Sequence, residues 1–309
     1  MGRMDELIGY GREHNCSDIH LTYGMEPLVR CNGKLVSLSG YGAMDDTVLE
    51  EIALEILQKE NVKIQGDGKM TDIDVCYETP DGTRNRVNIY HQQKHTAIAI
   101  RLLNAHIPTL EELQMPSVMK ELTELSQGLV LVTGQAGSGK STTLAACINE
   151  INCTRRCHII TIEDPVEYLH SNKNSMINQR EVGADTPSFS EALKSSLRED
   201  PDVILVGEMK DTQTILAAVT AAETGHLVFS ALHIADAEAA IERMVEIFPP
   251  YQQQQIRNQL ATVLKAVVSQ RLVASADGDG RIFAQEILLV NDDVAEMIRE
   301  GKYHRSLKL

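Results

Sequence analysis

The stretch that decides the fold is Leu129-Val130-Leu131-Val132-Thr133, followed by Gly134-Gln135-Ala136-Gly137-Ser138-Gly139-Lys140-Ser141 and then Thr142-Thr143-Leu144-Ala145-Ala146. The apolar run predicts a buried strand, the glycine-rich segment a loop, and the last five residues the start of a helix. Glycines let backbone N–H groups converge on phosphate oxygens, and a helix N-terminus adds a favourable dipole. We therefore predict a phosphate-binding loop, with an ordinary glycine turn as the alternative.

The side chains of this loop predict which ligand it holds. Lys140 places a positive charge near the β- and γ-phosphates of a nucleotide, and the Ser141 hydroxyl is a ligand for Mg²⁺. ATP and Mg²⁺ are thus the expected ligand and cofactor. The residues expected to contact the nucleotide are Gly134, Gln135, Ala136, Gly137, Ser138, Gly139, Lys140, Ser141 and Thr142.

Composition limits the class of protein. The chain has 309 residues, 43% of them hydrophobic, with no Trp and four Phe, so aliphatic side chains must build its core. A net charge of −15 argues against a constitutive nucleic-acid binder, which usually carries a basic surface. The first residues are polar and no apolar run approaches the ~18 residues of a membrane span. A cytoplasmic location is expected.

The cysteines are scattered. They are Cys16, Cys31, Cys76, Cys147, Cys153 and Cys157. Cys153, Cys157 and His158 form a C-x₃-C-H cluster, but no second ligand pair stands at zinc-site spacing. Reduced structural thiols are the expectation, and a metal site is the alternative.

The amino-terminal third predicts an α+β unit over residues 1–104. A helix opens near Asp5, and a second helix is predicted over residues 47–59. Short runs with alternating apolar residues and glycine or proline turns predict strands. The predicted strands are residues 17–22, 27–31, 34–38, 71–78, 83–92 and 96–103. Residues 104–109, which include Pro108, are predicted to be a linker.

The remaining residues, 110–309, predict a second domain. Apolar strands alternate with amphipathic helices, which is typical of an α/β fold with a parallel sheet. Strands are predicted at 129–133, 158–162, 203–206 and 226–232. Helices are predicted at 211–223, capped by Asp211, and at 235–247 and 251–272.

Acidic residues follow two of these strands. Glu163 ends the first, before Asp164 and Pro165, and Glu208 follows the second after Gly207. Ligands of open α/β sheets bind beyond the carboxyl ends of strands. Glu163 is therefore a candidate to orient or deprotonate a water that attacks the γ-phosphate, and Glu208 a candidate to position that water or act through the water shell of the metal. Solvated or structural carboxylates are the alternative.

Two histidines flank a third strand. His226 precedes it and His233 follows it, seven residues later. A histidine in such a place is usually a hydrogen-bonded core residue. The alternative is that both sense the γ-phosphate, and no third ligand is evident for a metal.

The four blocks together resemble the secretion ATPase superfamily of type II secretion and type IV pilus motors, with the pilus retraction ATPases most similar. Gly134–Thr142 resembles its Walker A, Ile162–Glu167 its Asp box, Arg198–Met209 its Walker B region and Ala222–His233 its His box. Ser17-Asp18-Ile19-His20 resembles the opening of its small domain. The resemblance implies a RecA-like P-loop ATPase domain over 110–309 and a smaller PAS-like α+β domain over 1–104.

The resemblance also implies partners and further site residues. Arg86 and Arg101 best match the arginines with which the small domain of this family reaches the phosphates. A homohexamer, an inner-membrane platform protein as partner and a position at the inner face of the cell membrane are implied. Pilus retraction is the expected function.

Some positions depart from the retraction ATPases. Lys210 stands where they usually have Arg, and Ala231 and Ile234 stand where they have Thr. The alternatives are therefore a nucleotide-gated regulatory protein or a pilus-extension ATPase of the same superfamily, with a nucleic-acid motor or a small-molecule kinase as weaker options. Extension ATPases often carry a tetracysteine zinc site, which this sequence lacks.

Overall fold

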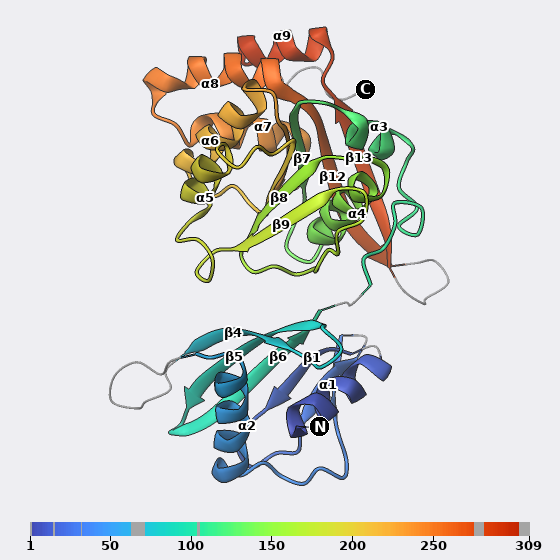
Figure 1. Cartoon of the computed structure of the whole chain (residues 1–309), viewed down its shortest axis with the longest axis vertical. Helices are drawn as coiled ribbons and strands as arrows, with labels where there is room; N and C mark the ends of the chain where they lie inside the picture. Colours follow the sequence, from blue (N-terminus) through green and yellow to red (C-terminus); the bar gives the residue numbers. More distant parts are fainter. Residues whose placement is uncertain are drawn as a thin grey trace. The chain divides into compact units, whose positions relative to one another are not determined.

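The computed structural model describes residues 2–14, 16–31, 33–62, 72–103, 106–274 and 281–302. They form two compact units (Figure 1). The first comprises Met1–His106, with which Glu167–Leu169 are grouped, and the second Ile107–Val166 and His170–Leu309. The expected strand start at Thr71 and the linker residues Asn104 and Ala105 lie outside the described residues.

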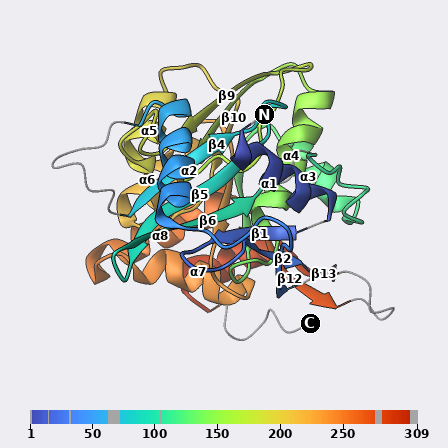
Figure 2. The same ribbon diagram turned by 90° about the horizontal axis from the view of Figure 1, so that it is seen from below.

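The first unit is a six-stranded antiparallel sheet with two helices on one face (Figures 1 and 2). The strand order is β3-β2-β1-β6-β5-β4. The helices are α1 (Arg3–Glu13) and α2 (Asp46–Lys59), and the strands are β1 (Cys16–Leu21), β2 (Leu28–Cys31), β3 (Lys34–Ser37), β4 (Ile73–Glu78), β5 (Arg84–Gln92) and β6 (His95–Leu102). The predicted helices and strands of this unit are confirmed, with ends that move by one or two residues.

Alternation along the strands explains which face the helices cover. In β5 the side chains of Val87 and Ile89 are fully buried in the core formed with α1 and α2, whereas Arg86, which precedes Val87, is exposed on the other face. The Asp45 carboxylate accepts a hydrogen bond from the Val48 N–H and begins α2. One face of the sheet therefore holds the apolar core, and the other carries polar side chains.

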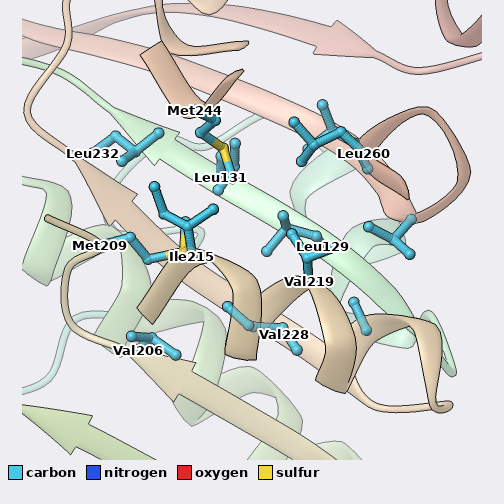
Figure 3. Packing of buried hydrophobic residues seen from close by; sticks show 14 of the residues in the cluster. Leu129, Leu131, Val206, Met209, Ile215, Val219, Val228, Leu232, Met244 and Leu260 are labelled. Carbon is cyan, nitrogen blue, oxygen red and sulfur yellow. The ribbon is translucent and has the colours of Figure 1, made fainter. Parts of the chain in front are cut away.

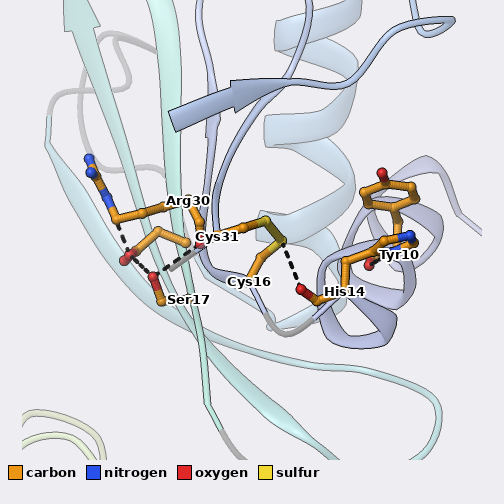
Figure 4. Close-up of a disulfide and its surroundings, with 7 residues drawn as sticks. Tyr10, His14, Cys16, Ser17, Arg30 and Cys31 are labelled. Atoms are coloured by element: carbon orange, nitrogen blue, oxygen red, sulfur yellow. Dashed lines mark hydrogen bonds and ion pairs between the residues drawn. A yellow bond between two sulfur atoms is a disulfide. The ribbon is translucent and has the colours of Figure 1, made fainter. Parts of the chain in front are cut away.

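One expectation about the cysteines is wrong. Cys16 and Cys31 form a disulfide, because they are directly paired on the antiparallel strands β1 and β2 (Figure 4). They are 15 residues apart in sequence, so the pairing follows from strand register and not from a C-x-x-C motif. Among the described residues, Cys76, Cys147, Cys153 and Cys157 are not disulfide-bonded.

The second unit is built on a seven-stranded mixed sheet with the order β13-β12-β7-β11-β10-β8-β9. Its strands are β7 (Gly128–Thr133), β8 (His158–Glu163), β9 (Met176–Glu181), β10 (Val203–Val206), β11 (Leu227–Leu232), β12 (Leu264–Ala274) and β13 (Arg281–Leu289). The four predicted strands β7, β11, β10 and β8 are parallel neighbours, as expected. The strands β12 and β9, which were not predicted, extend this parallel arrangement on its two sides. The expectation of a wholly parallel sheet is wrong at one edge, where β13 runs antiparallel to β12.

Helices cover both faces of this sheet. Leu129 and Leu131 of β7 face α5 (Phe189–Ser196), α6 (Thr212–Glu223), α7 (Ala237–Glu246), α8 (Pro250–Val263) and α9 (Asp292–Glu300). Figure 3 shows Leu131 packed beside Met244 and Leu129 near Val219 and Leu260. The alternate residues Val130 and Val132 face α3 (Val118–Glu124) and α4 (Lys140–Thr154). Both faces of β7 are thus buried, and polar groups are left to the strand ends.

The predicted helix over residues 251–272 is wrong in its second half. The helix α8 ends at Val263, and β12 begins at the next residue. The apolar spacing of this segment is compatible with either structure, and pairing of β12 with β7 on one side and β13 on the other decides for a strand. Within the described part of the chain, no helix combines the length and apolarity that crossing a membrane requires.

Candidate functional site

The glycine-rich loop joins β7 to α4 in a conformation that needs its glycines. Gly137 and Gly139 have φ angles of 73° and 87°, in the left-handed region. A Cβ atom on Gly134 would lie 2.4 Å from the carbonyl oxygen of Gln270, and one on Gly139 would lie 2.5 Å from the ring of Phe283. The loop is therefore pressed against the β12–β13 hairpin, with no room for side chains at these two positions.

The β12 residue Gln270 ties the loop to the helix that follows it. Its Nε2 donates a 2.8 Å hydrogen bond to the Ser138 carbonyl, and its Oε1 accepts a 2.9 Å hydrogen bond from the Thr143 hydroxyl. Beside it, the Thr133 hydroxyl donates to Ser269 Oγ at 2.9 Å. Sequence reasoning missed Gln270 and Phe283, because β12 was expected to be helical and no motif marks either residue.

Lys140 is buried and its ammonium group faces the loop. Nζ donates to the carbonyl oxygens of Gly134 and Gln135, both at 2.9 Å, and lies 3.3 Å from His233 Nδ1. The hydroxyl of Ser138 is also buried and finds no hydrogen-bond partner among the described residues. A polyphosphate fits this donor set, because it would accept from the ammonium, the hydroxyl and the backbone N–H groups of a loop without side-chain bulk.

Ser141 and Thr142 occupy the first turn of α4 after Lys140. Ser141 is exposed there, and Gly139 precedes the helix in the N-cap position. The hydroxyl of Ser141 is thus exposed beside the glycine-rich loop, at the position where the sequence predicts a magnesium ligand. The exposed residues Gln135 and Ala136 form the outer turn of the loop.

His233 connects the loop to the acidic residue after β10. Its Nε2 lies 3.2 Å from Glu208 Oε2, and the other carboxylate oxygen pairs with Lys210 Nζ. An ammonium group can only donate, so the contact with Lys140 makes His233 Nδ1 the acceptor and leaves the ring proton on Nε2, toward Glu208. Because Glu208 Oε2 accepts no well-aligned hydrogen bond, this contact is electrostatic.

Glu163 stands at the end of β8, where the strand was predicted to stop. Its Oε1 accepts a 2.6 Å hydrogen bond from the Thr161 hydroxyl and a 3.2 Å hydrogen bond from Gln179 Nε2. A Cβ atom on Gly207 would lie 3.3 Å from Glu163 Cα. The glycine in the position before Glu208 therefore lets the ends of β8 and β10 approach closely.

The sheet order brings the carboxyl ends of these strands side by side, and we call this end of the sheet the carboxyl edge. Thr133 pairs with Leu232, and Val206 pairs with Ser230 and Ile162. The P-loop, His233, Glu208 and Glu163 each follow one of these parallel strands. At 4.7–4.9 Å per strand, β8 lies roughly 14 Å along the edge from β7, with His233 and Glu208 in the interval.

His226 does not lie at the carboxyl edge of the sheet. It precedes β11, whose first residue Leu227 pairs with Gly128 at the start of β7. Its Nδ1 donates a 2.9 Å hydrogen bond to the Ala221 carbonyl, and Thr224 Oγ1 lies 3.2 Å away. A strand of this length spans about 20 Å, so only His233 of the two histidines lies beside Lys140.

Arg86 and Arg101 lie in the first unit as a directly paired couple on β5 and β6. Arg101 Nε donates to Asp18 Oδ1 at 3.2 Å, and Arg86 Nε lies 3.9 Å from Asp74 Oδ1. The side chain of Arg101 is 67% exposed and that of Arg86 is 49% exposed. Asp18 also pairs with Arg30 on β2, so a row of three arginines and one aspartate crosses the helix-free face of the sheet.

Comparison with known proteins identifies relatives along most of the chain. Residues 82–304 match the model of the "Type II/IV secretion system protein" family. A Pseudomonas aeruginosa protein described as the type IV pilus retractation ATPase PilT is 41% identical over 297 residues, which cover 96% of this chain and 85% of the relative. A Neisseria gonorrhoeae twitching motility protein is 44% identical over 283 residues, which cover 89% of this chain and 73% of the relative.

A solved structure has the same fold. The crystal structure of the pilus retraction motor PilT with bound ADP superposes with a TM-score of 0.88 at 42% identity, and the match covers 98% of this chain and 87% of that one. The α/β fold is shared between the two. On these matches, the chain belongs to the type II/IV secretion system protein family.

Proposed function

We propose that this protein is an ATP-hydrolysing motor of a type IV pilus, acting in pilus retraction. The observation that carries the proposal is the buried Lys140 in its glycine loop, with His233 and Glu208 next along the same sheet edge. The names of the relatives, a retraction ATPase and a twitching motility protein, support the function, and the ADP in the related structure supports the ligand.

In this proposal each site residue has a separate task. Lys140 and the N–H groups of Gly134–Thr142 hold the phosphates, and Ser141 would hold Mg²⁺. When bound, Mg²⁺ would neutralise charge that develops on the transferred phosphoryl group. Glu163 orients the attacking water and Glu208 supports that position. His233, in contact with both Lys140 and Glu208, senses whether a phosphate is present.

The first unit contributes positive charge in this proposal. Arg86 and Arg101 neutralise the γ-phosphoryl group of bound ATP, which an exposed guanidinium fork suits. Their existing partners are carboxylates, so a phosphate group competes with Asp18 and Asp74 for the same donors. We assign the first unit as a PAS-like domain (1–104) and the second as a RecA-like ATPase domain (110–309), from the family resemblance.

The family resemblance supports the remaining proposals. The protein assembles as a homohexamer, works at the inner face of the cell membrane and pushes on an inner-membrane platform protein. His226, on the opposite edge of the sheet from Lys140, has no proposed contact with the nucleotide bound in its own chain.

Phosphate release from ATP tests the proposal. Wild-type protein is expected to hydrolyse ATP in the presence of Mg²⁺ and to stop when EDTA is added. Lys140→Ala should lower the rate at least about 100-fold, because a buried cation on the phosphates is lost. The control is Lys194→Ala, which removes an exposed lysine of α5. An unchanged rate in Lys140→Ala would overturn the proposal.

A second arm tests the motor role. The wild-type gene should restore pilus retraction to a pilus-bearing strain that lacks its own retraction ATPase, and Lys140→Ala should not. ATP hydrolysis that rises steeply on addition of DNA or RNA and weakens with salt would instead identify a nucleic-acid motor. Hydrolysis without restoration of retraction would move the function to another task within the family.

A further inference from the structure

The carboxylate of Glu163 is held by donors from two adjacent strands. Thr161 and Gln179 are directly paired between β8 and β9. Both donate to the same oxygen, Glu163 Oε1, at 2.6 Å from Thr161 Oγ1 and 3.2 Å from Gln179 Nε2. Thr161 is fully buried and Gln179 half-buried. Two donors on one oxygen restrict where the carboxylate can lie.

The amide of Gln179 cannot be reversed without breaking the hydrogen bonds at both of its ends. Its Oε1 accepts a 2.7 Å hydrogen bond from the backbone N–H of His170, in the segment between β8 and β9. This contact assigns the oxygen to His170 and the NH₂ group to Glu163. A reversed amide would place an oxygen against a carboxylate and an NH₂ group against an N–H donor. Gln179 therefore joins the backbone at His170 to the Glu163 side chain in one defined orientation.

We propose that Gln179 and Thr161 are positioning residues for ATP hydrolysis, which hold Glu163 in the rotamer that addresses the attacking water. The inference rests on the role given to Glu163 in the proposed function. Neither residue touches ATP in this scheme. They remove freedom from the side chain of Glu163 before nucleotide binds, so that the carboxylate need not be reoriented during the reaction. Their loss should lower turnover and leave ATP affinity unchanged.

The chain offers matched variants for the test. Gln179→Met keeps an unbranched side chain of similar length without the donor, and Thr161→Val keeps the shape of the buried side chain without the hydroxyl. Thr161→Ser keeps the hydroxyl. Asn178→Met is the control, because Asn178 is the neighbouring residue of β9, lies on the opposite face and contacts His158 Nε2 at 2.9 Å. All are measured as the full-length protein for kcat, KM and the Kd of ATP.

We expect Gln179→Met and Thr161→Val each to lower kcat about tenfold, with KM and Kd within about twofold of wild type. Thr161→Ser should restore most of the rate, and Asn178→Met should match wild type. Gln179→Glu should be slower than Gln179→Met, because its carboxylate would repel Glu163. A merely structural role gives the opposite order, since Glu has the shape of Gln. That opposite order, or an equal loss in Asn178→Met, would overturn the proposal.

A Glu163→Gln background separates this inference from the proposed function. If Gln179 acts through Glu163, adding Gln179→Met to Glu163→Gln should cause no further loss in single-turnover hydrolysis. A further tenfold loss contradicts the inference. If Glu163→Gln is slow and Gln179→Met is as fast as wild type, only the inference fails. If Glu163→Gln itself turns over at the wild-type rate, the role of Glu163 fails and the inference with it.

Thermal unfolding confirms that each variant is folded. If Thr161→Val does not fold, the comparison of Gln179→Glu with Gln179→Met still tests the proposal.

Discussion

The two sheets of this protein are covered differently. The sheet of the second unit has helices on both faces, whereas α1 and α2 both lie on one face of the first unit's sheet (Figures 1 and 2). In β7 every side chain is buried, so polar chemistry can occur only where the strand ends. In β5 buried side chains alternate with more exposed ones, and the arginine pair of β5 and β6 lies on a face of the sheet.

The difference assigns separate physical roles to the units. A strand end is a fixed point, because the strand behind it is packed on both sides, and the Lys140 loop, His233, Glu208 and Glu163 stand at such points. The arginines stand on a partly exposed surface and are held by carboxylates of neighbouring strands. We infer that the second unit supplies side chains that are fixed in place before the nucleotide binds. The first unit supplies exposed arginines, whose carboxylate partners a phosphate group can replace.

The largest expected effect tests the charge contributed by the first unit. Arg101→Ala should lower kcat for ATP about 10³-fold, or about 4 kcal/mol, the lower end of what an arginine finger contributes. Arg30→Ala is the matched control, because Arg30 belongs to the same row and pairs with the same Asp18. Equal losses in both variants would show that the row acts through the fold of the first unit and not through one guanidinium.

The free-energy cost of a glycine-to-alanine change in each unit tests how closely the backbone is packed there. Gly134→Ala should destabilise the second unit by about 3–4 kcal/mol, because a Cβ atom would overlap a backbone carbonyl. Gly82→Ala should cost about 1–2 kcal/mol, since Gly82 has a φ of 80° with open space around it. Hydrogen exchange of β7 and β5 peptides reports each unit separately. Similar costs at both positions would contradict the close packing of the loop on β12.

Reduction of the disulfide should affect the first unit alone. Opening a loop of 15 residues costs about 3 kcal/mol, so β1 and β2 amides should exchange roughly 150-fold faster in the Cys16→Ser, Cys31→Ser protein. The second unit serves as internal control, because both substituted cysteines belong to the first unit and the described cysteines of the second are not disulfide-bonded. Unchanged exchange in β1 and β2 would show that the bond adds no stability.

Acid should weaken the second unit through His170. Burial, and then the charge of Lys173, lowers the pKa of His170 to about 4 from its ordinary 6.5, and its Nδ1 has no partner among the described residues. The unfolded chain therefore binds the proton first, and stability should fall by about 3 kcal/mol as the pH drops from about 6.5 to about 4. His170→Met should flatten this part of the curve in denaturant unfolding. An equally steep curve in the variant would place the acid sensitivity elsewhere.

In the second unit, local sequence patterns mark the candidate site residues but not the residues that pack against them. The Gly134–Ser141 run, Glu163 and Glu208 stand out in the sequence because each adjoins a mainly apolar strand. Gln270 and Phe283, which press on the loop, are invisible in the sequence because β12 becomes a strand only through pairing with β7 and β13. The opposite positions of His226 and His233 could have been deduced, because a strand that runs parallel to β7 places them at opposite edges.

In the first unit the Cys16–Cys31 bond could also have been found from the sequence. Both cysteines lie at the far ends of two adjacent predicted strands, and an antiparallel hairpin brings those ends together. The row formed by Arg30, Asp18, Arg101 and Arg86 could not, since it joins four strands whose order differs from their order in sequence.

The central claim is that the loop around Lys140 binds ATP and that Glu163 acts on it. The most direct measurement compares the Kd of ATP and single-turnover hydrolysis in wild type and in Glu163→Gln. The account predicts a Kd within about twofold of wild type and a rate lower by at least about 100-fold, because the amide keeps the shape of the side chain and cannot take up a proton. A rate equal to that of wild type, or a loss of ATP binding that accounts for the slower hydrolysis, would contradict it.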